Sequence, residues 1–238
     1  MSLHAVLCSA WKTGIIPSDW KRGRVVPLWK GKGDHQDCNN SRGVTLLSVP
    51  GNVFARIIID RVCHHLLEHQ RPEQSGFTPK RSTIEDLLAL RVLTERRRAF
   101  RQGLLAAYVD LCKAFDSGNQ DALWRILGIR GVSPKLIDLM SELYSGAESA
   151  VRCGDTISDL FPVITGVRHG CVLAPTLFST CLDWILGRMS ERSSCGASFG
   201  NVKISDLDFA DDAVTFAETL DILLGALKVL YEESEPLG

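Results

Sequence analysis

The chain has 238 residues, of which 45% are hydrophobic and 23% are charged, and its formal net charge at pH 7 is −1. These values are typical of a globular protein and exclude an intrinsically disordered chain. No apolar run approaches the roughly 20 residues that a transmembrane helix requires, so we expect no association with a membrane. The eight cysteines occur singly, without a C-x-x-C pair, which indicates free thiols in a reducing compartment.

The charges are distributed unevenly along the chain. Residues 1–103 contain 17 Lys and Arg against 9 Asp and Glu, whereas residues 104–238 contain 10 against 19. A basic half joined to an acidic half suggests a polyanionic partner for the first and cations for the second. Solvated helix faces would produce the same pattern, and charge alone does not separate the two interpretations.

The first predicted elements are a short strand over 24–29 and, after a loop rich in Gly and Asn, a helix over 51–69. A capping box at residues 82–85 predicts a second helix, which ends at Gly103. An uncharged apolar strand then ends at Asp110.

The second half of the chain mixes helices with antiparallel hairpins. Hairpins are expected over 149–163, around Gly154-Asp155, and over 202–217, with the sequence ADDA at the turn. The expected helices cover 119–128, 134–145, 175–190 and 219–233. This order favours an α+β fold over a doubly wound parallel sheet.

Three acids lie where predicted strands end: Asp110 on one strand, and Asp211 with Asp212 at the tip of the second hairpin. Clustered carboxylates cannot all stay ionised without a cationic partner, and Mg²⁺ prefers a few carboxylates together with substrate phosphates. Two such ions about 4 Å apart would activate a 3′-hydroxyl and stabilise a leaving pyrophosphate, which indicates nucleotidyl or phosphoryl transfer. A pair of aspartates at a turn also has an ordinary structural explanation, because Asp favours turns.

Six motifs follow one another along nearly the whole chain: PSDWKRGRVVPLWKGKGD, NNSRGVTLLSVPGNVFARIIIDRV, EQSGFTPKRST, YVDLCKAFD, GVRHGCVLAPTLF and FADD. In this order they resemble the reverse transcriptase domain of non-LTR (LINE-like) retrotransposons. The resemblance implies a right-hand polymerase with fingers over 1–103, an antiparallel palm sheet packed on helices over 104–238, and no thumb. It also implies RNA-directed DNA synthesis from dNTPs on an RNA template with a DNA primer, with Mg²⁺ or Mn²⁺ as cofactor. Together with the free thiols, this role predicts an intracellular location, in the cytoplasm and/or the nucleus.

The resemblance also assigns roles to individual residues. Metal ions would be held by Asp110, Asp211 and Asp212. Nucleotide-binding roles fall on Lys30, Arg42, Phe115, His169 and Gly170, and template contact falls on Arg81. Phe115 would crowd a ribose 2′-hydroxyl and so favour deoxynucleotides. Ordinary alternatives stay open: a core ring for Phe115, exposed surface cations for Lys30 and Arg81, and a turn glycine for Gly170.

Several departures from the family pattern favour a second hypothesis, a catalytically inactive remnant that acts at most as a nucleic-acid-binding module. His169 stands where the family has glutamine, and Gly118 stands where it has a β-branched residue. The chain also stops before the family's lysine-bearing strand and thumb. An RNA-directed RNA polymerase would share the acidic trio, but Phe115 argues against it.

Two charged groups receive no catalytic role from the sequence. The run Arg96–Arg98 is expected to be a solvated helix end that makes, at most, sequence-independent phosphate contacts. Asp206 and Asp208 alternate with apolar residues in the second hairpin, so we expect both to face solvent.

Overall fold

The computed structural model describes residues 2–34, 36–110 and 114–237, and for Asp110, Ala114 and Asp116 it describes the backbone alone. The helices are α1 Leu3–Thr13, α2 Ser18–Lys21, α3 Val49–Glu68, α4 Thr83–Ala99, α5 Ala114–Ser117, α6 Gln120–Ile129, α7 Pro134–Tyr144, α8 Ala174–Arg192 and α9 Leu220–Ser234, with short 3₁₀ turns at Cys38–Asn40 and Glu235–Leu237. The strands are β1 Arg22–Trp29, β2 Ser41–Leu47, β3 Leu105–Asp110, β4 Glu148–Cys153, β5 Thr156–Ile157, β6 Phe161–Pro162, β7 Ala197–Phe199, β8 Val202–Ile204, β9 Asp206–Phe209 and β10 Asp212–Ala217.

Local sequence signals explain most helix starts. The side chain of Asn119 accepts a hydrogen bond from the Ala122 amide at the start of α6, and Pro134 occupies the first turn of α7. Helix α4 begins after Ser82 as expected, but it ends at Ala99 rather than Gly103. The structure also contains α1, α2 and β2, which the sequence patterns did not predict.

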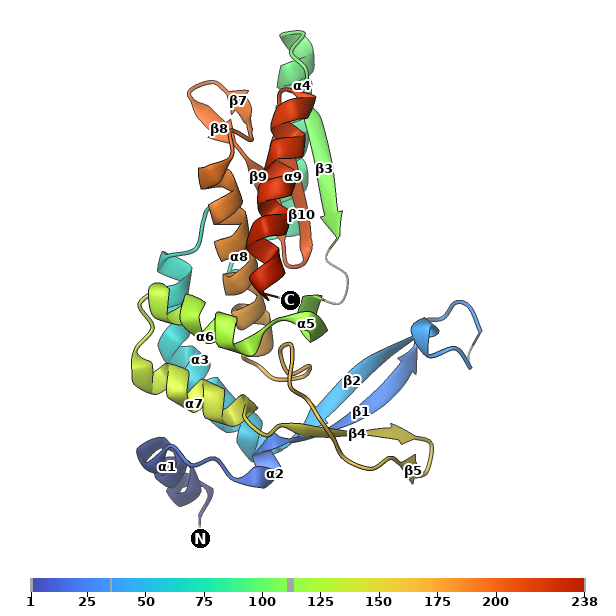
Figure 1. The fold of residues 1–238 in the computed structure, drawn as a ribbon, viewed down its shortest axis with the longest axis vertical. Helices are drawn as coiled ribbons and strands as arrows, with labels where there is room; N and C mark the ends of the chain where they lie inside the picture. The colour runs from blue at the N-terminus through green and yellow to red at the C-terminus, as the bar shows by residue number, and fades with distance from the viewer. Residues whose placement is uncertain (1, 35, 111–113, 238) are drawn as a thin grey trace.

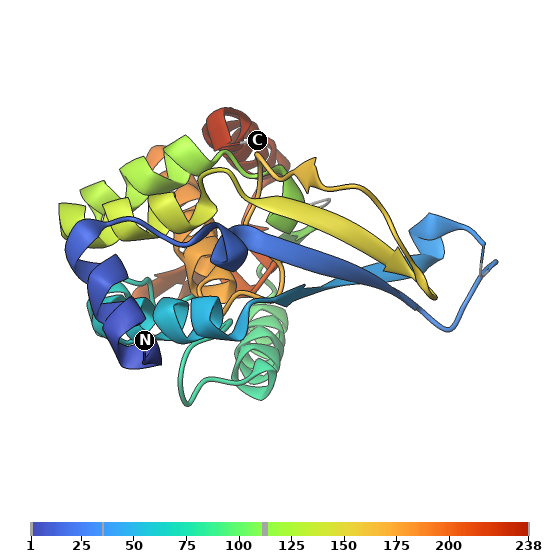
Figure 2. The same cartoon turned by 90° about the horizontal axis from the view of Figure 1, so that it is seen from below.

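One sheet forms an arm that projects away from the helices (Figures 1 and 2). Its strand order is β2-β1-β4-β5, with β6 paired to β4. Strands β1 and β2 are an antiparallel hairpin, whereas β1 and β4 run parallel, with Gly23 opposite Ser149. The expected hairpin around Gly154 is confirmed by the pairing of β4 with β5. The arm therefore joins strands from both halves of the sequence.

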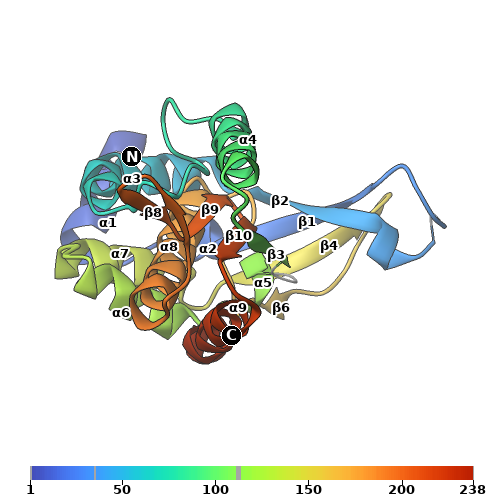
Figure 3. The same ribbon diagram turned by 90° about the horizontal axis from the view of Figure 1, so that it is seen from above.

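The second sheet has the order β3-β10-β9 and lies between helices (Figure 3). Helix α4 contacts β9, and α9 contacts β10 and β3. The side chains of β10 alternate accordingly: Val214 and Phe216 pack with Leu93 of α4, while Ala213 joins the main core. The second predicted hairpin is confirmed in part. Strands β9 and β10 pair across ADDA, but β8 pairs with β7 instead.

The main hydrophobic core lies between α3, α6, α7, α8 and α9. Phe54 and Ile58 of α3 are fully buried, and Phe54 contacts the ring of Trp20 at a centroid distance of 5.6 Å. Leu177 and Leu186 supply the matching face of α8. Across the described residues, no helix combines the length and the apolar character needed to cross a membrane.

Candidate functional site

The predicted acidic residues meet at one end of the three-stranded sheet. Strands β9 and β10 are joined by a two-residue turn, Ala210-Asp211, in which Ala210 has a left-handed φ of 59°. Asp212 is the first residue of β10, and the register places it directly opposite Asp110, the last residue of β3. Two acids that are far apart in the sequence are thus neighbours in the ladder.

Asp211 and Asp212 are both solvent-exposed. Within the described part of the chain, neither carboxylate makes an ion pair with a lysine, arginine or histidine. Carboxylate oxygens without a protein cation suit a hard divalent ion, which takes oxygen ligands. No cluster of three His, Cys, Asp or Glu side chains able to hold a metal occurs among the described residues. The side chain of Asp110 lies outside them, so the metal-binding trio stays a prediction.

Phe115 and His169 lie together beside the main core. The Phe115 ring stacks on Phe178 of α8 at a centroid distance of 4.2 Å, and it lies 5.7 Å from the ring of His169. The backbone carbonyl of Phe115 accepts a hydrogen bond from the Val167 amide at 2.7 Å. Phe115 is partly exposed, so one face of the ring packs on the core while the side chain still reaches the surface. Its role as a sugar gate stays a prediction.

Gly170 has a specific structural reason to be glycine. Its φ is 79°, and a Cβ atom at this position would lie 2.2 Å from the carbonyl oxygen of Thr45 in β2. The loop before α8 is thus packed directly on the backbone of the arm. Arg168 anchors the same loop, because its buried guanidinium donates to the carbonyls of Leu143 at 3.0 Å and Trp20 at 2.9 Å. Sequence reasoning gave Arg168 no role.

The predicted phosphate-binding cations lie on the arm. Lys30 follows β1 and donates from Nζ to the carbonyl of Asn39 at 2.8 Å, and Arg42 pairs with Leu28 near the tip of the hairpin. Both side chains are exposed. Among the described residues no recorded contact joins either cation to the acidic turn. Arg81 is exposed at the start of α4, where it pairs with Glu85 at 3.3 Å.

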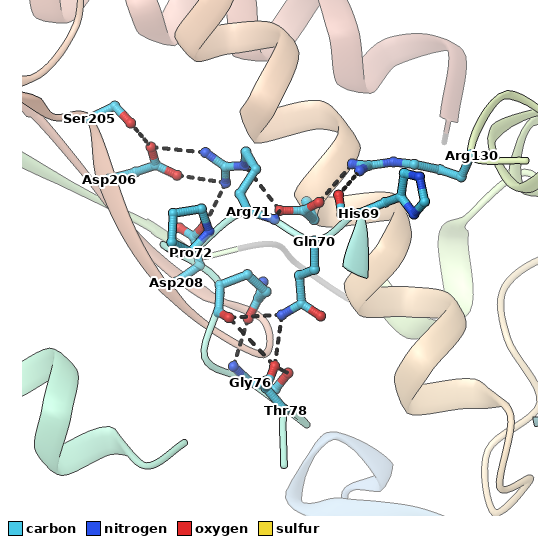
Figure 4. A network of polar contacts seen from close by, with 12 residues as sticks. His69, Gln70, Arg71, Pro72, Gly76, Thr78, Arg130, Ser205, Asp206 and Asp208 are labelled. Carbon is cyan, nitrogen blue, oxygen red and sulfur yellow. Dashed lines mark hydrogen bonds and ion pairs between the residues drawn. The ribbon is translucent and has the colours of Figure 1, made fainter. Parts of the chain in front are cut away.

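The expectation that Asp206 and Asp208 face solvent is wrong. Both side chains are fully buried, and both accept hydrogen bonds from the guanidinium of Arg71 (Figure 4). Strand β9 does alternate, with the aspartates on one face and Leu207 on the other. The face that carries Leu207 packs on α4, and the face that carries the aspartates is also covered and does not meet solvent. The face with the aspartates meets Arg71, which no local pattern in the strand could reveal. Burial, followed by the charge of Asp206, raises the pKa of the Asp208 carboxyl well above its ordinary value.

The expectation of a solvated arginine run is also wrong at its centre. Arg97 is buried, and its guanidinium donates to the carbonyl of Gly103 and to Glu218 at 2.8 Å. Accepting hydrogen bonds from Ser198, and to a lesser extent from Arg97, lowers the pKa of the Glu218 carboxyl. Arg97 thus holds the end of β10 against α4 and is not available to phosphates.

Comparisons with known proteins agree with this geometry. Residues 30–238 match the family "Reverse transcriptase (RNA-dependent DNA polymerase)". The chain is 29% identical over 91% of its length to the 149 kDa protein of transposon TX1 from Xenopus laevis, and 27% identical over 89% to the Pol polyprotein of retrotransposable element R2 from Popillia japonica. It spans only 17% and 29% of these two relatives.

The fold is similar to solved telomerase structures. Apo telomerase from Candida tropicalis, truncated of its C-terminal domain, superposes with a TM-score of 0.63 at 15% identity, over 98% of this chain and 52% of that one. A telomerase from the same organism in complex with a fragment of telomeric RNA gives a TM-score of 0.62. At this identity the likeness concerns the fold alone. The family match covers most of the chain, and the chain therefore belongs to the reverse transcriptase family, with relatives among the Pol proteins of non-LTR retrotransposons.

Proposed function

We propose that the chain is the polymerase module of a retrotransposon protein, which extends a DNA primer on an RNA template from dNTPs. The observation that carries this proposal is the register of β3 and β10, which places Asp110 opposite Asp212, beside a turn that carries Asp211. In a member of the reverse transcriptase family, this arrangement supports two-metal nucleotidyl transfer.

Asp110, Asp211 and Asp212 would hold two Mg²⁺ ions, for which Mn²⁺ can substitute. When bound, the ions supply the positive charge that activates the primer 3′-hydroxyl and stabilises the leaving pyrophosphate. The exposure of Asp211 and Asp212 supports this role, because substrate oxygens must complete the coordination. Phe115 contacts the rings of Phe178 and His169, and in this proposal its own ring would discriminate at the sugar of the incoming nucleotide.

The arm and the three-stranded sheet would correspond to the fingers and the palm of a right-hand polymerase. Lys30 and Arg42 on the arm would bind the triphosphate, and Arg81 would contact the template. His169 and Gly170 would border the nucleotide from the loop that packs against the arm. A boundary at residue 103 stays a prediction, and β4 crosses it in space because it pairs with β1.

A primer-extension assay tests the proposal. The 238-residue chain is incubated with an RNA template, a DNA primer, dNTPs and Mg²⁺, and extension is compared between wild type and Asp211→Asn. Extension that the substitution abolishes supports the enzyme. Tight binding of the template–primer without extension would instead support the alternative, an inactive nucleic-acid-binding remnant. A Phe115→Ala variant adds the sugar test, since ribonucleotide incorporation is expected to rise relative to wild type.

A further inference from the structure

Arg71 forms an ion cluster with three buried aspartates, two of which belong to β9 (Figure 4). Its Nε donates to Asp183 of α8 at 3.0 Å. Its two terminal nitrogens grip Asp206 in a bidentate pair at 3.1 and 2.8 Å, and one of them also reaches Asp208 at 2.8 Å. One guanidinium therefore joins α8 to two residues of β9, three and five positions before Asp211.

Such a cluster is a poor source of stability. The three carboxylates are at most 2% exposed, and burying charges costs several kcal/mol for each ion even where the ions are paired. Arg130 also binds Asp183, at 2.7 Å, yet the cluster still holds three acids against two arginines. Apolar side chains would fill the same space at lower cost. What a guanidinium adds is a fixed planar geometry, because its donors match two carboxylates in one orientation only.

A second set of contacts runs from Arg71 to the turn through the backbone. The segment after Arg71 lies along the free edge of β9: the Asp208 amide donates to the carbonyl of Glu73 at 3.1 Å, and the Ser75 amide donates to the carbonyl of Asp208 at 2.8 Å. Gly76 then touches the turn itself, since a Cβ atom there would lie 1.9 Å from the amide nitrogen of Ala210. Strand β9, which leads into the acidic turn, is therefore held along its edge by the backbone of 73–76 and through its buried aspartates by the side chain of Arg71.

The segment is itself held in shape by its own side chains. The Gln70 amide donates to the carbonyl of Gln74 at 2.8 Å and to the Thr78 hydroxyl at 2.7 Å. The side-chain oxygen of Gln74 accepts from the Gly76 amide at 2.8 Å. Because Arg71 lies at the start of this segment, a loss of its side-chain contacts would remove the anchor on the buried face of β9 and leave only the contacts along its edges.

Resting on the proposed function, we propose that Arg71 is a positioning residue: its guanidinium fixes β9 and the adjoining segment 72–76 so that Asp211 and Asp212 keep the geometry that metal binding requires. Arg71 touches no substrate in this proposal and acts only through β9. Groups that hydrogen-bond directly to metal ligands typically contribute about 10- to 100-fold to metal affinity, and we expect the lower end of this range for Arg71, which acts through the strand.

The test measures Mn²⁺ binding to the 238-residue chain by electron paramagnetic resonance, without nucleotide. Arg71→Met is expected to raise the half-saturating Mn²⁺ concentration about 10-fold. Arg71→Lys is expected to recover only part of this loss, because an ammonium cannot bridge two carboxylates as a planar fork does. The matched control is Arg97→Met, which removes another buried, carboxylate-paired arginine at the far end of β10 and is expected to leave Mn²⁺ affinity unchanged.

A triple variant, Arg71→Met with Asp206→Asn and Asp208→Asn, separates positioning from charge neutralisation. It removes the uncompensated acids and is expected to regain stability while Mn²⁺ binding stays weak. Wild-type affinity in the triple variant would overturn the proposal, because Arg71 would then only neutralise charge, and so would wild-type affinity in Arg71→Met.

Hydrogen exchange in the wild type and in Arg71→Lys decides the matter if Arg71→Met and the triple variant do not fold or if Mn²⁺ binding is too weak to measure. The amides of 73–76 and 206–212 are expected to exchange faster in Arg71→Lys than in the wild type, and unchanged rates would overturn the proposal. Primer extension keeps the two proposals apart. A wild type that binds Mn²⁺ through an Arg71-dependent site but extends no primer contradicts the proposed function and not the role of Arg71.

Discussion

Replacing Gly170 by alanine tests how the loop before α8 meets the arm. The substitution adds one methyl group at a position where φ is 79° and where the nearest atom, the Thr45 carbonyl oxygen, would lie 2.2 Å away. The added Cβ is fixed to the backbone of residue 170, and the Thr45 carbonyl oxygen is itself a backbone atom. Neither can rotate out of the way, so the two backbone segments must separate. Since Thr45 belongs to β2, the disturbance is transmitted to the arm.

The expected cost has two parts. Holding alanine in the left-handed region costs about 1–2 kcal/mol. Forcing an extra carbon into a packed contact costs about 1–3 kcal/mol more. Gly146→Ala isolates the first part, because Gly146 has a φ of 64° and the added methyl group would have no neighbouring atom within 4 Å. The gain from a stiffer unfolded chain is common to both variants and cancels in the comparison.

Urea denaturation of the two variants and the wild type measures the difference. We expect Gly170→Ala to lose about 1–3 kcal/mol more unfolding free energy than Gly146→Ala. In primer extension, Gly170→Ala is expected to raise the KM for dNTP, while Gly146→Ala leaves it unchanged. Equal stability losses in the two variants would refute the close approach of Gly170 to β2, and the reasoning built on it.

Three further predictions concern the interior. Because the pKa of Asp208 is raised in the folded protein, its contribution to the unfolding free energy is present below the ordinary carboxyl pKa and is lost as the pH rises through the raised value. Asp208→Asn should therefore flatten the dependence of the unfolding free energy on pH, measured by urea denaturation from about pH 4 to 8. Phe54→Ala should lower the unfolding free energy by about 3–5 kcal/mol, whereas the exposed Leu220→Ala should change it by less than about 0.5 kcal/mol. Burial raises the pKa of the partly exposed Cys181 thiol to about 11, so iodoacetamide at neutral pH should label the exposed Cys153 faster than Cys181. Peptide mass mapping measures both rates, and equal rates would contradict the raised pKa.

The elements that the sequence predicted are those whose signals are local. The helix that begins at Pro134 and the hairpin around Gly154 follow from caps and turn residues a few positions apart. The turn at Asp211 could be found in the same way. In contrast, β2 was not predicted, because its residues alternate only weakly and it becomes a strand by pairing with β1 over seven positions.

The errors in the site share one cause: a partner from another part of the chain. Asp206 was expected in solvent, because an isolated strand offers no reason to bury a carboxylate, and Arg71, which supplies that reason, lies 135 residues away. Arg97 was expected in solvent for the same reason, although Glu218 pairs with it from a distance of 121 residues. Buried ion pairs leave no periodic signature, so only the tertiary fold shows which charged residues belong to the interior.

Within seven residues the chain treats two pairs of aspartates in opposite ways. Asp206 and Asp208 are fully buried, and the guanidinium of Arg71 makes an ion pair with each of them. Asp211 and Asp212 are exposed and have no ion pair among the described residues. In the proposed function, divalent cations would offset the repulsion between the two exposed carboxylates, and the buried pair, fixed by Arg71, would hold β9 so that the exposed pair keeps its position.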